Sequence, residues 1–316
     1  MRLSVVVVNW NSRDHLRDCL ASLAAQSHRD LETIVVDNGS TDGSAEMVAA
    51  DFASARLVRL GANLGFAEGC NRGIAASSGP WVATLNNDTV ADPEWARSVI
   101  DAAAQAPAHC GMLQSLMLFR ERPGVVNSAG LELTRGGAGR DRWEERPRPP
   151  ATDRETQEIF CPTAGAAAYR REMLDAIHLS GGWFDRDHFM YFEDLDLGWR
   201  GRLAGWTARY VPTAVVFHTW HGSVGRHGAS WLEVMASTNR TRTLVKNASP
   251  LFILGAAPEL MGDIVMVTRH GGLEALGRFA GAVRHSLKQR DEVSRMIRVS
   301  RREVERIGRA SGSVRS

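Results

Sequence analysis

The sequence predicts an α/β protein with a mostly parallel sheet flanked by helices, and three observations indicate this fold. A continuous run of β-branched residues near the N-terminus leads directly into a segment with helical spacing. The same order of strand and helix recurs up to about residue 95. Shorter apolar runs and then a basic segment without strand patterns follow, and they predict a mixed second half and a C-terminal helical extension.

The first part of the chain alternates strands with helices. Strands are expected at residues 3–8, 31–37, 56–60 and 81–85, and helices at residues 14–25 and 45–52. In the first helix Leu16, Cys19, Leu20 and Leu23 recur at the three- and four-residue spacing of one helix face. Because parallel strands end at a common edge, ligand chemistry is expected at their C-terminal ends.

The second part departs from this alternation. Residues 135–150 are rich in Gly, Arg and Pro, which predicts a long mobile loop. After it, strands are expected at residues 161–169, 206–211 and 214–218, and helices at residues 170–176 and 194–203. We therefore expect one domain with a first half (1–95) and a mixed second half (96–246), followed by a basic amphipathic helical extension (247–316).

Composition narrows the class of protein. The chain has 316 residues, of which 44% are hydrophobic, and this suffices for a sizeable core. Its four cysteines are far apart, which argues against a zinc cluster and a dense disulfide framework and favours a reducing cytosol. The apolar run at residues 3–8 is too short for a signal peptide core, and Glu259 and Asp263 interrupt the longest apolar stretch.

An acidic cluster among aromatic residues is the most informative motif. Glu193, Asp194 and Asp196 fall within four residues in the segment 189–200, which also contains Phe, Tyr and Trp. An ionised carboxylate in apolar surroundings is costly unless it is paired, so such a cluster indicates a functional site. A helix N-terminus, where the same acids complement the dipole, explains the pattern equally well.

Three further chemistry-bearing residues end predicted strands. Asp37 could accept hydrogen bonds from a nucleobase or ribose, although Asp-Asn-Gly-Ser is also common turn chemistry. Asp88 could hold a hard cation that neutralises a diphosphate. His218 could complete that metal shell; a lone histidine is often only a polar strand end, but further His and Trp residues follow closely.

Two segments suit substrate contacts. Residues 63–73 place Asn63, Gly65 and Asn71 around the start of a helix. The segment could form a wall of a nucleotide site, or its glycines could simply allow tight packing. Residues 163–168 have small side chains, including Gly165 and Ala166, which an acceptor could approach closely. The aromatic faces of Trp183 and Phe184 could stack on a sugar or belong to the core.

Taken together, six segments resemble the inverting glycosyltransferases of family 2, which use the GT-A fold. They are residues 5–11, 35–44, 63–66, 86–88, 181–185 and 189–200. The resemblance covers about residues 3–246. It implies that residues 1–246 form a GT-A glycosyltransferase domain, in which residues 1–95 are the nucleotide-binding half and residues 96–246 the acceptor and catalytic half. Within the family the chain is similar to the bacterial rhamnosyltransferases and galactofuranosyltransferases that build cell-wall or surface polysaccharide.

The resemblance assigns roles to residues. It implies that Asp194 is the catalytic base with Glu193 and Asp196 orienting it, that Arg200 pairs with this cluster, and that Asp88 and His218 bind Mg²⁺ or Mn²⁺. The implied donor-binding set is Asn9, Asn11, Asp37, Asn38, Asn63, Gly65, Asn71, Asn86, Asn87 and Asp88, and the implied acceptor set is Gly165, Ala166, Trp183, Phe184, Asp196 and Arg200. One position departs from the family, because Asn86 stands where the metal motif Asp-x-Asp has its first aspartate.

The implied reaction is a single displacement that moves a sugar from a nucleoside diphosphate to a glycan or polyprenyl-linked acceptor with inversion. The preferred donor is dTDP-L-rhamnose; UDP-galactofuranose or a UDP-hexose are the alternatives. A nucleotidyltransferase would normally have a Gly-rich basic loop after the first strand, and residues 9–13 do not form one. A sugar-binding protein without activity would tolerate the loss of Asp194 or His218, and both are present.

The C-terminal extension is basic. Residues 264–316 contain twelve Lys or Arg and five Asp or Glu, whereas the whole chain has a formal net charge of +2. Its apolar stripes are Leu273, Leu276, Phe279, Ala280, Val283 and Leu287, then Val293, Met296, Ile297, Val304 and Ile307. We expect it to lie on an anionic membrane at the cytoplasmic face or to pack on its own domain; a nucleic-acid partner is not expected, since aromatic residues are not interleaved.

Overall fold

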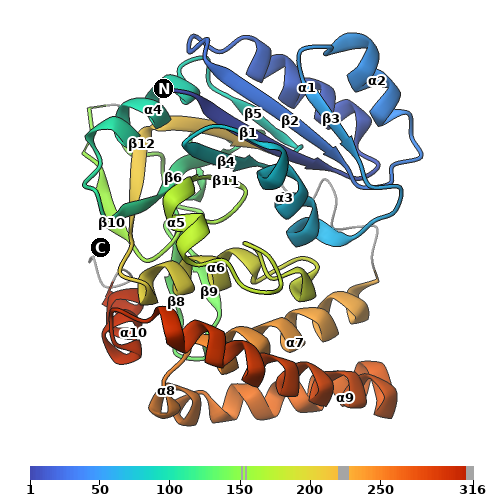
Figure 1. Ribbon diagram of the computed structural model, residues 1–316, viewed down its shortest axis with the longest axis vertical. Helices are drawn as coiled ribbons and strands as arrows, with labels where there is room; N and C mark the ends of the chain where they lie inside the picture. The colour runs from blue at the N-terminus through green and yellow to red at the C-terminus, as the bar shows by residue number, and fades with distance from the viewer. Residues whose placement is uncertain (151, 154, 220–227, 311–316) are drawn as a thin grey trace.

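The computed structural model describes residues 1–150, 152–153, 155–219 and 228–310, and it confirms the α/β fold (Figure 1). The strands are β1 (Leu3–Asn9), β2 (Leu31–Asp37), β3 (Arg56–Arg59), β4 (Trp81–Leu85), β5 (Thr89–Ala91), β6 (Cys110–Phe119), β7 (Val126–Ser128), β8 (Leu131–Leu133), β9 (Gly139–Asp141), β10 (Gln157–Ile159), β11 (Ala166–Arg170) and β12 (Thr207–His218). The helices are α1 (Arg13–Ala24), α2 (Ser44–Asp51), α3 (Gly65–Ala76), α4 (Trp95–Gln105), α5 (Arg171–Ala176), η1 (Arg186–His188), α6 (Glu193–Leu203), α7 (Ala229–Asn247), α8 (Pro250–Gly255), α9 (Ala257–Met296) and α10 (Arg301–Ala310).

The main sheet has a parallel half and a mixed half. Its strand order is β10-β12-β6-β11-β4-β1-β2-β3. Strand β1 pairs in parallel with both β2 and β4, and β2 pairs in parallel with β3. Strand β11 is antiparallel to β4 and to β6, while β12 is parallel to β6. The C-terminal ends of β1, β2 and β4 therefore meet at one edge, where the sequence predicted the ligand site.

Helices cover both faces of this sheet, as the continuous apolar strands require. All seven residues of β1 are buried. Val5 and Val7 belong to one core with α1 and α4, and Val6 and Val8 belong to a second core with α3 and α5. The predicted face of α1 is buried as expected. The sequence therefore predicted the first half of the sheet closely.

The mixed half differs from the prediction. The strand expected at residues 161–169 begins only at Ala166, and the two strands expected at residues 206–211 and 214–218 are the single strand β12. Pro212 separates the two apolar runs in sequence, and the structure accommodates it as a register shift between Val211 and Val215. Strand β6 was not predicted, because its buried run has neither alternation nor β-branched residues.

The loop expected at residues 135–150 is also partly structured. Residues Gly139–Asp141 form β9, which pairs with β8. The buried Arg142 donates its backbone N–H to Gly130 at 2.8 Å, and its guanidinium stacks on Trp143 at 3.6 Å. Arg142, one of the arginines of the expected mobile loop, thus has its partners within the fold.

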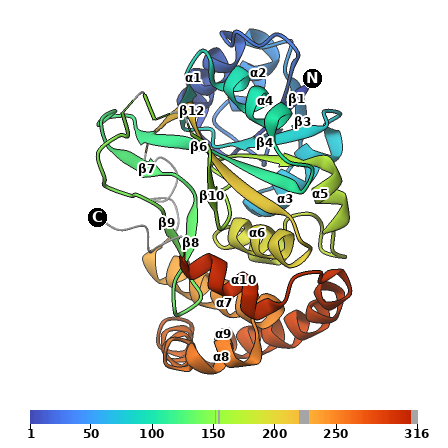
Figure 2. The ribbon, with the colours of Figure 1, turned by 90° about the vertical axis from the view of Figure 1, so that its left-hand side faces the viewer.

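The C-terminal helices form a layer at the end of the molecule opposite α1 and α2 (Figures 1 and 2). Helix α7 packs along α9, in which Gly272 has a φ of 65° and divides the helix in two. The stripe that includes Val293 and Val304 packs into a core with Trp199 of α6, so α10 packs on its own domain. Among the described residues we find no helix whose length and apolar character would let it cross a membrane.

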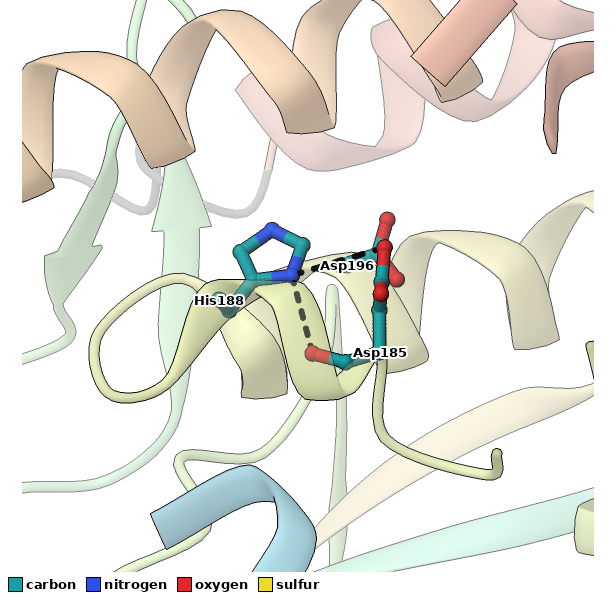
Figure 3. A group of neighbouring side chains, drawn as sticks. All are labelled: Asp185, His188 and Asp196. Atoms are coloured by element: carbon teal, nitrogen blue, oxygen red, sulfur yellow. Dashed lines mark hydrogen bonds and ion pairs between the residues drawn. The ribbon is translucent and has the colours of Figure 1, made fainter. Parts of the chain in front are cut away.

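A buried cluster of charged side chains connects α6, α7 and η1. Lys246 of α7 contacts Asp185 and lies 2.9 Å from Asp196, and Arg200 Nε donates to Asp196 at 2.9 Å. All four side chains are fully buried. Two carboxylates and two cations balance the charge, which is what makes such burial tolerable. Figure 3 shows His188 beside the two carboxylates.

The pKa values of this cluster follow its geometry. Burial alone would raise the pKa of Asp185 and Asp196. The attraction of Lys246, together with hydrogen bonds to Asp185 and the attraction of Arg200 for Asp196, outweighs burial and holds both pKa values below the ordinary range. Burial and the neighbouring Lys246 lower the pKa of His188 to about 4, so this imidazole is neutral near pH 7. The cluster is therefore a charge-balanced set of two anions and two cations at neutral pH.

We expect Lys246→Met to lower the free energy of unfolding by about 3–5 kcal/mol, because it leaves two buried carboxylates with only one cation. The matched control is Arg59→Met, which breaks the exposed pair of Arg59 and Glu46 and should cost less than about 1 kcal/mol. Equilibrium unfolding in urea at pH 7 measures both variants. Equal losses in the two variants would contradict the proposed importance of the cluster.

The pH dependence of stability has a definite sign. Because the folded pKa values of Asp185 and Asp196 are lowered, their contribution is present above the ordinary aspartate pKa and is lost as pH falls through the folded values. Wild-type protein should thus lose stability on acidification below about pH 5, and Lys246→Met should lose less over the same range.

Candidate active site

A cavity of about 580 Å³ opens at the C-terminal edge of β1, β2 and β4. This volume is typical of small-molecule sites. The predicted site residues that line it are Asn38, Asn63, Gly65, Asn86, Asn87, Asp88, Gly165, Glu193, Asp194 and His218. Residues far apart in the sequence thus contribute to one cavity, and Ala236 shows that α7 also forms part of the wall.

Strand pairing brings Asp88 and His218 together. Thr89, which follows Asp88, is the register partner of His218, and Thr219 donates its backbone N–H to the Asp88 carbonyl at 2.9 Å. His218 Nε2 then lies 3.2 Å from Asp88 Oδ1. The pairing of β5 with β12 therefore creates a carboxylate and an imidazole side by side in the cavity wall.

The orientation of His218 is fixed by its other contact. His218 Nδ1 lies 2.8 Å from Asn127 Oδ1, an oxygen that only accepts, so Nδ1 donates to it and Nε2 is the nitrogen that faces Asp88. An imidazole nitrogen and a carboxylate oxygen side by side can hold either a proton or a metal ion between them. The donor set of carboxylate oxygen and imidazole nitrogen, with the amide of Asn86 in the same lining, fits a divalent cation.

A second group of metal-ligating residue types does not need a metal. Asp185, His188 and Asp196 place their ligand atoms within 4.8 Å of one another. Figure 3 shows these three side chains. However, Lys246 already contacts both carboxylates, so the chain itself supplies the positive charge. The Asp88 and His218 pair is therefore the better metal candidate of the two groups.

Several predicted donor-binding asparagines hold loops together. Asn87 donates to Asn9 at 2.7 Å, and Asn9 donates to Ser40 at 3.2 Å. Asn11, which has a φ of 51°, accepts from the backbone of Thr41 at 2.7 Å. These bonds connect the loops after β1, β2 and β4, so they fix the edge on which the cavity forms.

The loop that begins α3 is fixed in the same way. Asn38 donates to Asn63 and to the Gly65 carbonyl, both at 3.0 Å, and accepts from Leu64 at 2.8 Å. Asp37 is buried, and its Oδ2 accepts only a long bond of 3.4 Å from Ser40. Its Oδ1 has no hydrogen-bond donor among the described residues, so it remains available beside the cavity.

Five predicted substrate contacts lie outside the cavity lining. The side-chain amide of Asn71 bonds to the backbone of Phe184: it donates to the carbonyl at 2.8 Å and accepts from the N–H at 2.9 Å. Phe184 is core, and Asp196 and Arg200 belong to the buried charge cluster. Trp183 lies edge-on to His178, 5.1 Å away. The geometry does not support a donor contact for Asn71, an acceptor contact for the other four side chains, or an orienting role of Asp196 toward Asp194.

Four other predicted residues lie near the cavity without lining it, namely Asn9, Asn11, Asp37 and Ala166. Ala166 is fully buried at the start of β11, next to the lining residue Gly165. Gly165 has little room for a side chain, since a Cβ there would meet Asn86 at 3.2 Å. The small residue is therefore needed for packing around Asn86.

Glu193 and Asp194 start α6 and face the cavity. Asp194 accepts backbone N–H bonds from Ala164 at 3.1 Å and Leu195 at 2.7 Å. Burial nevertheless raises the pKa of Asp194, and burial together with the Asp194 charge raises the pKa of Glu193 well above the ordinary value. The structure agrees with both interpretations of the acidic cluster, because its three acids lie in the first turn of a helix and two of them line the cavity.

Asp141 is a cavity residue that the sequence did not indicate. It lies on β9, lines the cavity, and bonds to Ser128. Burial and the nearby Asp194 raise its pKa to about 6. The surrounding Arg, Gly and Pro residues suggested a solvated loop, and only the pairing of β9 with β8 brings this carboxylate to the site.

The segment before α6 has a strained backbone. Phe189, Tyr191 and Phe192 all have positive φ values, between 60° and 70°, which is uncommon for aromatic residues. Asn239 of α7 donates to the carbonyls of His188, Met190 and Tyr191 at 2.7, 3.0 and 3.1 Å. Gly65 allows the close approach of Phe189, because a Cβ there would lie 2.6 Å from its ring. We call residues 188–192 the aromatic loop.

Comparisons with known proteins identify the family and the fold. The family model described as "Glycosyl transferase family 2" matches residues 4–177. A relative from Mycobacterium tuberculosis, named N-acetylglucosaminyl-diphospho-decaprenol L-rhamnosyltransferase, is 34% identical over 245 residues, which cover 73% of this chain and 80% of the relative. A Rhizobium meliloti protein named "Succinoglycan biosynthesis protein ExoO" is 35% identical over 34% of this chain and 31% of its own length.

Solved structures share the fold. A structure titled GalNAc-T7 with UDP, GalNAc and Mn²⁺ has a TM-score of 0.63 at 16% identity, covering 92% of this chain and 56% of that chain. The mannosyltransferase PcManGT from Pyrobaculum calidifontis, in complex with GDP-Man and Mn²⁺, has a TM-score of 0.54 at 17% identity, covering 93% and 85%. At these identities the likeness establishes a GT-A-like fold.

Replacing Asn239 should release the aromatic loop. Asn239→Asp keeps the shape but removes the amide protons and turns a carboxylate toward three carbonyls, so we expect a loss of about 2–3 kcal/mol in unfolding free energy. Amide hydrogen exchange should also become faster in residues 186–195 than elsewhere in the chain. The matched control is Thr238→Ala, whose hydroxyl bonds only within α7 to Val234. Unchanged exchange in residues 186–195 would contradict this role of Asn239.

Proposed function

The chain belongs to glycosyltransferase family 2, and we propose that it is a metal-dependent, inverting transferase that moves a hexosyl group from a nucleoside diphosphate to an acceptor hydroxyl. One observation carries this proposal: a single cavity contains the Asp88 and His218 pair together with Asp194. Asp88 and His218 are suited to bind a cation that offsets the charge of the diphosphate, and Asp194 is suited to act as a base.

In the proposed mechanism the chain's own residues position the reactants and move one proton. Asp194 accepts the proton from the acceptor hydroxyl as that oxygen attacks the anomeric carbon and the bond to the diphosphate breaks. Asp88 and His218 would hold Mg²⁺ or Mn²⁺, which when bound neutralises charge on the departing diphosphate. Attack from the face opposite the leaving group inverts the configuration.

Donor recognition would use the loops at the strand ends. Asp37 Oδ1 is buried and has no donor among the described residues, so it can accept a hydrogen bond from the nucleobase or ribose. Asn38, Asn63 and Gly65 would form the neighbouring wall. Asn86 would supply an uncharged oxygen at the position that the Asp-x-Asp motif of the family gives to an aspartate, so we expect the metal site to depend more on His218.

We propose L-rhamnose from dTDP-L-rhamnose as the transferred sugar. The Mycobacterium tuberculosis relative, which is aligned over most of both chains, is named an L-rhamnosyltransferase. The alternatives within the same mechanism are UDP-galactofuranose and a UDP-hexose. Membership of the family favours all of these over a nucleotidyltransferase.

We propose a lipid-linked acceptor for bacterial cell-wall or surface polysaccharide, used at the cytoplasmic face of the cell membrane. The name of the same relative includes a decaprenol-linked saccharide. The excess of Lys and Arg after residue 264 favours contact with anionic lipid. Residues 63–66 and 188–192 would frame the donor side, and the region of Gly165 and Asp141 would face the acceptor.

A panel of nucleotide sugars tests the proposed function. Purified protein should bind and slowly hydrolyse one donor in Mn²⁺ or Mg²⁺ and lose this activity in EDTA. Asp88→Ala should reduce the activity by about 10–100-fold or more, whereas Asp101→Ala, outside the cavity lining, should leave it unchanged. Failure to bind any donor would contradict the proposal.

Asp194→Asn should reduce turnover by about 10²–10⁴-fold without changing the donor Kd, because only the transferred proton loses its acceptor. In the wild type, the raised pKa of Asp194 predicts that kcat falls as pH decreases through a value above about 3.9, the ordinary aspartate pKa. The control is Asp101→Asn. Near wild-type turnover in Asp194→Asn would show that another group is the base.

A further inference from the structure

The surface of α8 and the first half of α9 is apolar where a helix usually shows charge. Its exposed large side chains are Leu251 (59% exposed), Leu254 (71%), Met261 (60%), Ile264 (36%) and Val265 (61%). We call this set the α8–α9 face. Single exposed apolar side chains are common, but so many on two consecutive helices mark an interaction surface.

The acids of this segment point inward. Residues 247–268 contain only two charged residues, Glu259 and Asp263. Asp263 is 2% exposed and receives Arg240 Nε from α7 at 2.9 Å. Glu259 is half-buried, and its side chain packs beside Gly136. The usual arrangement of a surface helix is reversed, with carboxylates toward the protein and leucine, methionine and valine toward the outside.

The remaining polar group on the face is also satisfied internally. The hydroxyl of Thr268 donates to the Ile264 carbonyl at 2.7 Å within its own turn. Between Lys246, which is buried, and Arg269, the segment therefore has no fully exposed charged side chain, because Asp263 is buried and Glu259 is half-buried. Such a surface can enter an apolar medium without stripping water from a charge.

Basic residues border the α8–α9 face. The exposed cations on α9 beyond it are Arg269, Arg278, Arg284, Lys288 and Arg295. The exposed acids on this part are Glu274, which pairs with Arg278, and Asp291. An apolar centre with a positive border complements an anionic lipid surface, in which side chains enter the acyl boundary and cations meet headgroups.

Charge also distinguishes a bilayer from a second copy of the chain. In a symmetric dimer the same face would meet itself, and the basic borders of the two copies would lie against each other. An anionic bilayer has no such conflict, and it needs no shape complementarity to accept these side chains. The layer formed by α8 and α9 also lies at one end of the molecule, where a flat surface can reach it (Figures 1 and 2).

We propose that the α8–α9 face docks on an anionic membrane surface, with Leu254, Met261 and Val265 entering the acyl boundary. The docking residues differ from those expected from the sequence, because the stripe that includes Val304 is buried against α6 and β8. This proposal adds the membrane as a partner and rests on the proposed function, since an enzyme that uses a lipid-linked acceptor must reach a membrane. Helix α7 packs against α9 and lines the cavity at Ala236, so it joins the docked surface to the site.

Vesicle flotation of the full chain tests the proposal. Wild-type protein should float with phosphatidylglycerol-containing vesicles and much less with pure phosphatidylcholine, because the basic border needs anionic headgroups. Leu254→Glu with Val265→Glu should reduce the bound fraction by about tenfold or more. The matched control, Ala50→Glu with Ala53→Glu, adds the same two charges at exposed positions in and just after α2 at the other end of the molecule.

Donor binding is measured on the same preparations, because it separates this proposal from the proposed function. The face variant should bind the nucleotide sugar like wild type, which also shows that it is folded. Equal flotation of the face variant and wild type would overturn the docking proposal, as would no flotation of wild type. Sedimentation that shows a wild-type dimer lost in the face variant would assign the face to a second copy and also overturn it. If wild-type protein floated with vesicles but bound no nucleotide sugar, the docking proposal would stand and the proposed function would be contradicted.

Discussion

The buried contact of Lys246 with Asp185 and Asp196 is the interaction on which the rest of the site depends. It joins α7 to α6 and to the turn before the aromatic loop, and each partner is fully buried. A buried charge cannot exchange its partner for water without a large cost, so the relative positions of these elements are fixed. Helix α6 carries Asp194 only two residues before Asp196, and the position of the proposed base follows from this cluster.

The aromatic loop shows how strain is maintained next to a site. Its positive φ values are unfavourable for large side chains, and Asn239 compensates by satisfying three carbonyls from one amide. Burial in the same region raises the pKa of Glu193 and Asp194. Both features cost stability, and both are the kind of cost that a preorganised site requires. The stable scaffold for them is the sheet and the charge cluster.

Helix α7 links parts of the molecule that the sequence separates. It provides Ala236 to the cavity, Asn239 to the aromatic loop and Lys246 to the charge cluster, and it packs along α9. The proposed boundary after residue 246 falls at the end of this helix. Helix α7 therefore separates α9 from the aromatic loop, and it connects the proposed membrane surface directly to the site.

The sequence by itself determined the parallel half of the sheet, because β-branched runs and helical spacing are local patterns that packing on both faces reinforces. It also indicated Asp88, His218 and Asp194, since polar residues at strand ends and clustered acids are visible in one dimension. Tertiary structure alone decided which asparagines hold loops, that Asp196 and Arg200 are buried with Lys246, and that Asp141 reaches the cavity. These outcomes depend on pairing between residues distant in the chain, and a side chain's partner is not encoded in its neighbours.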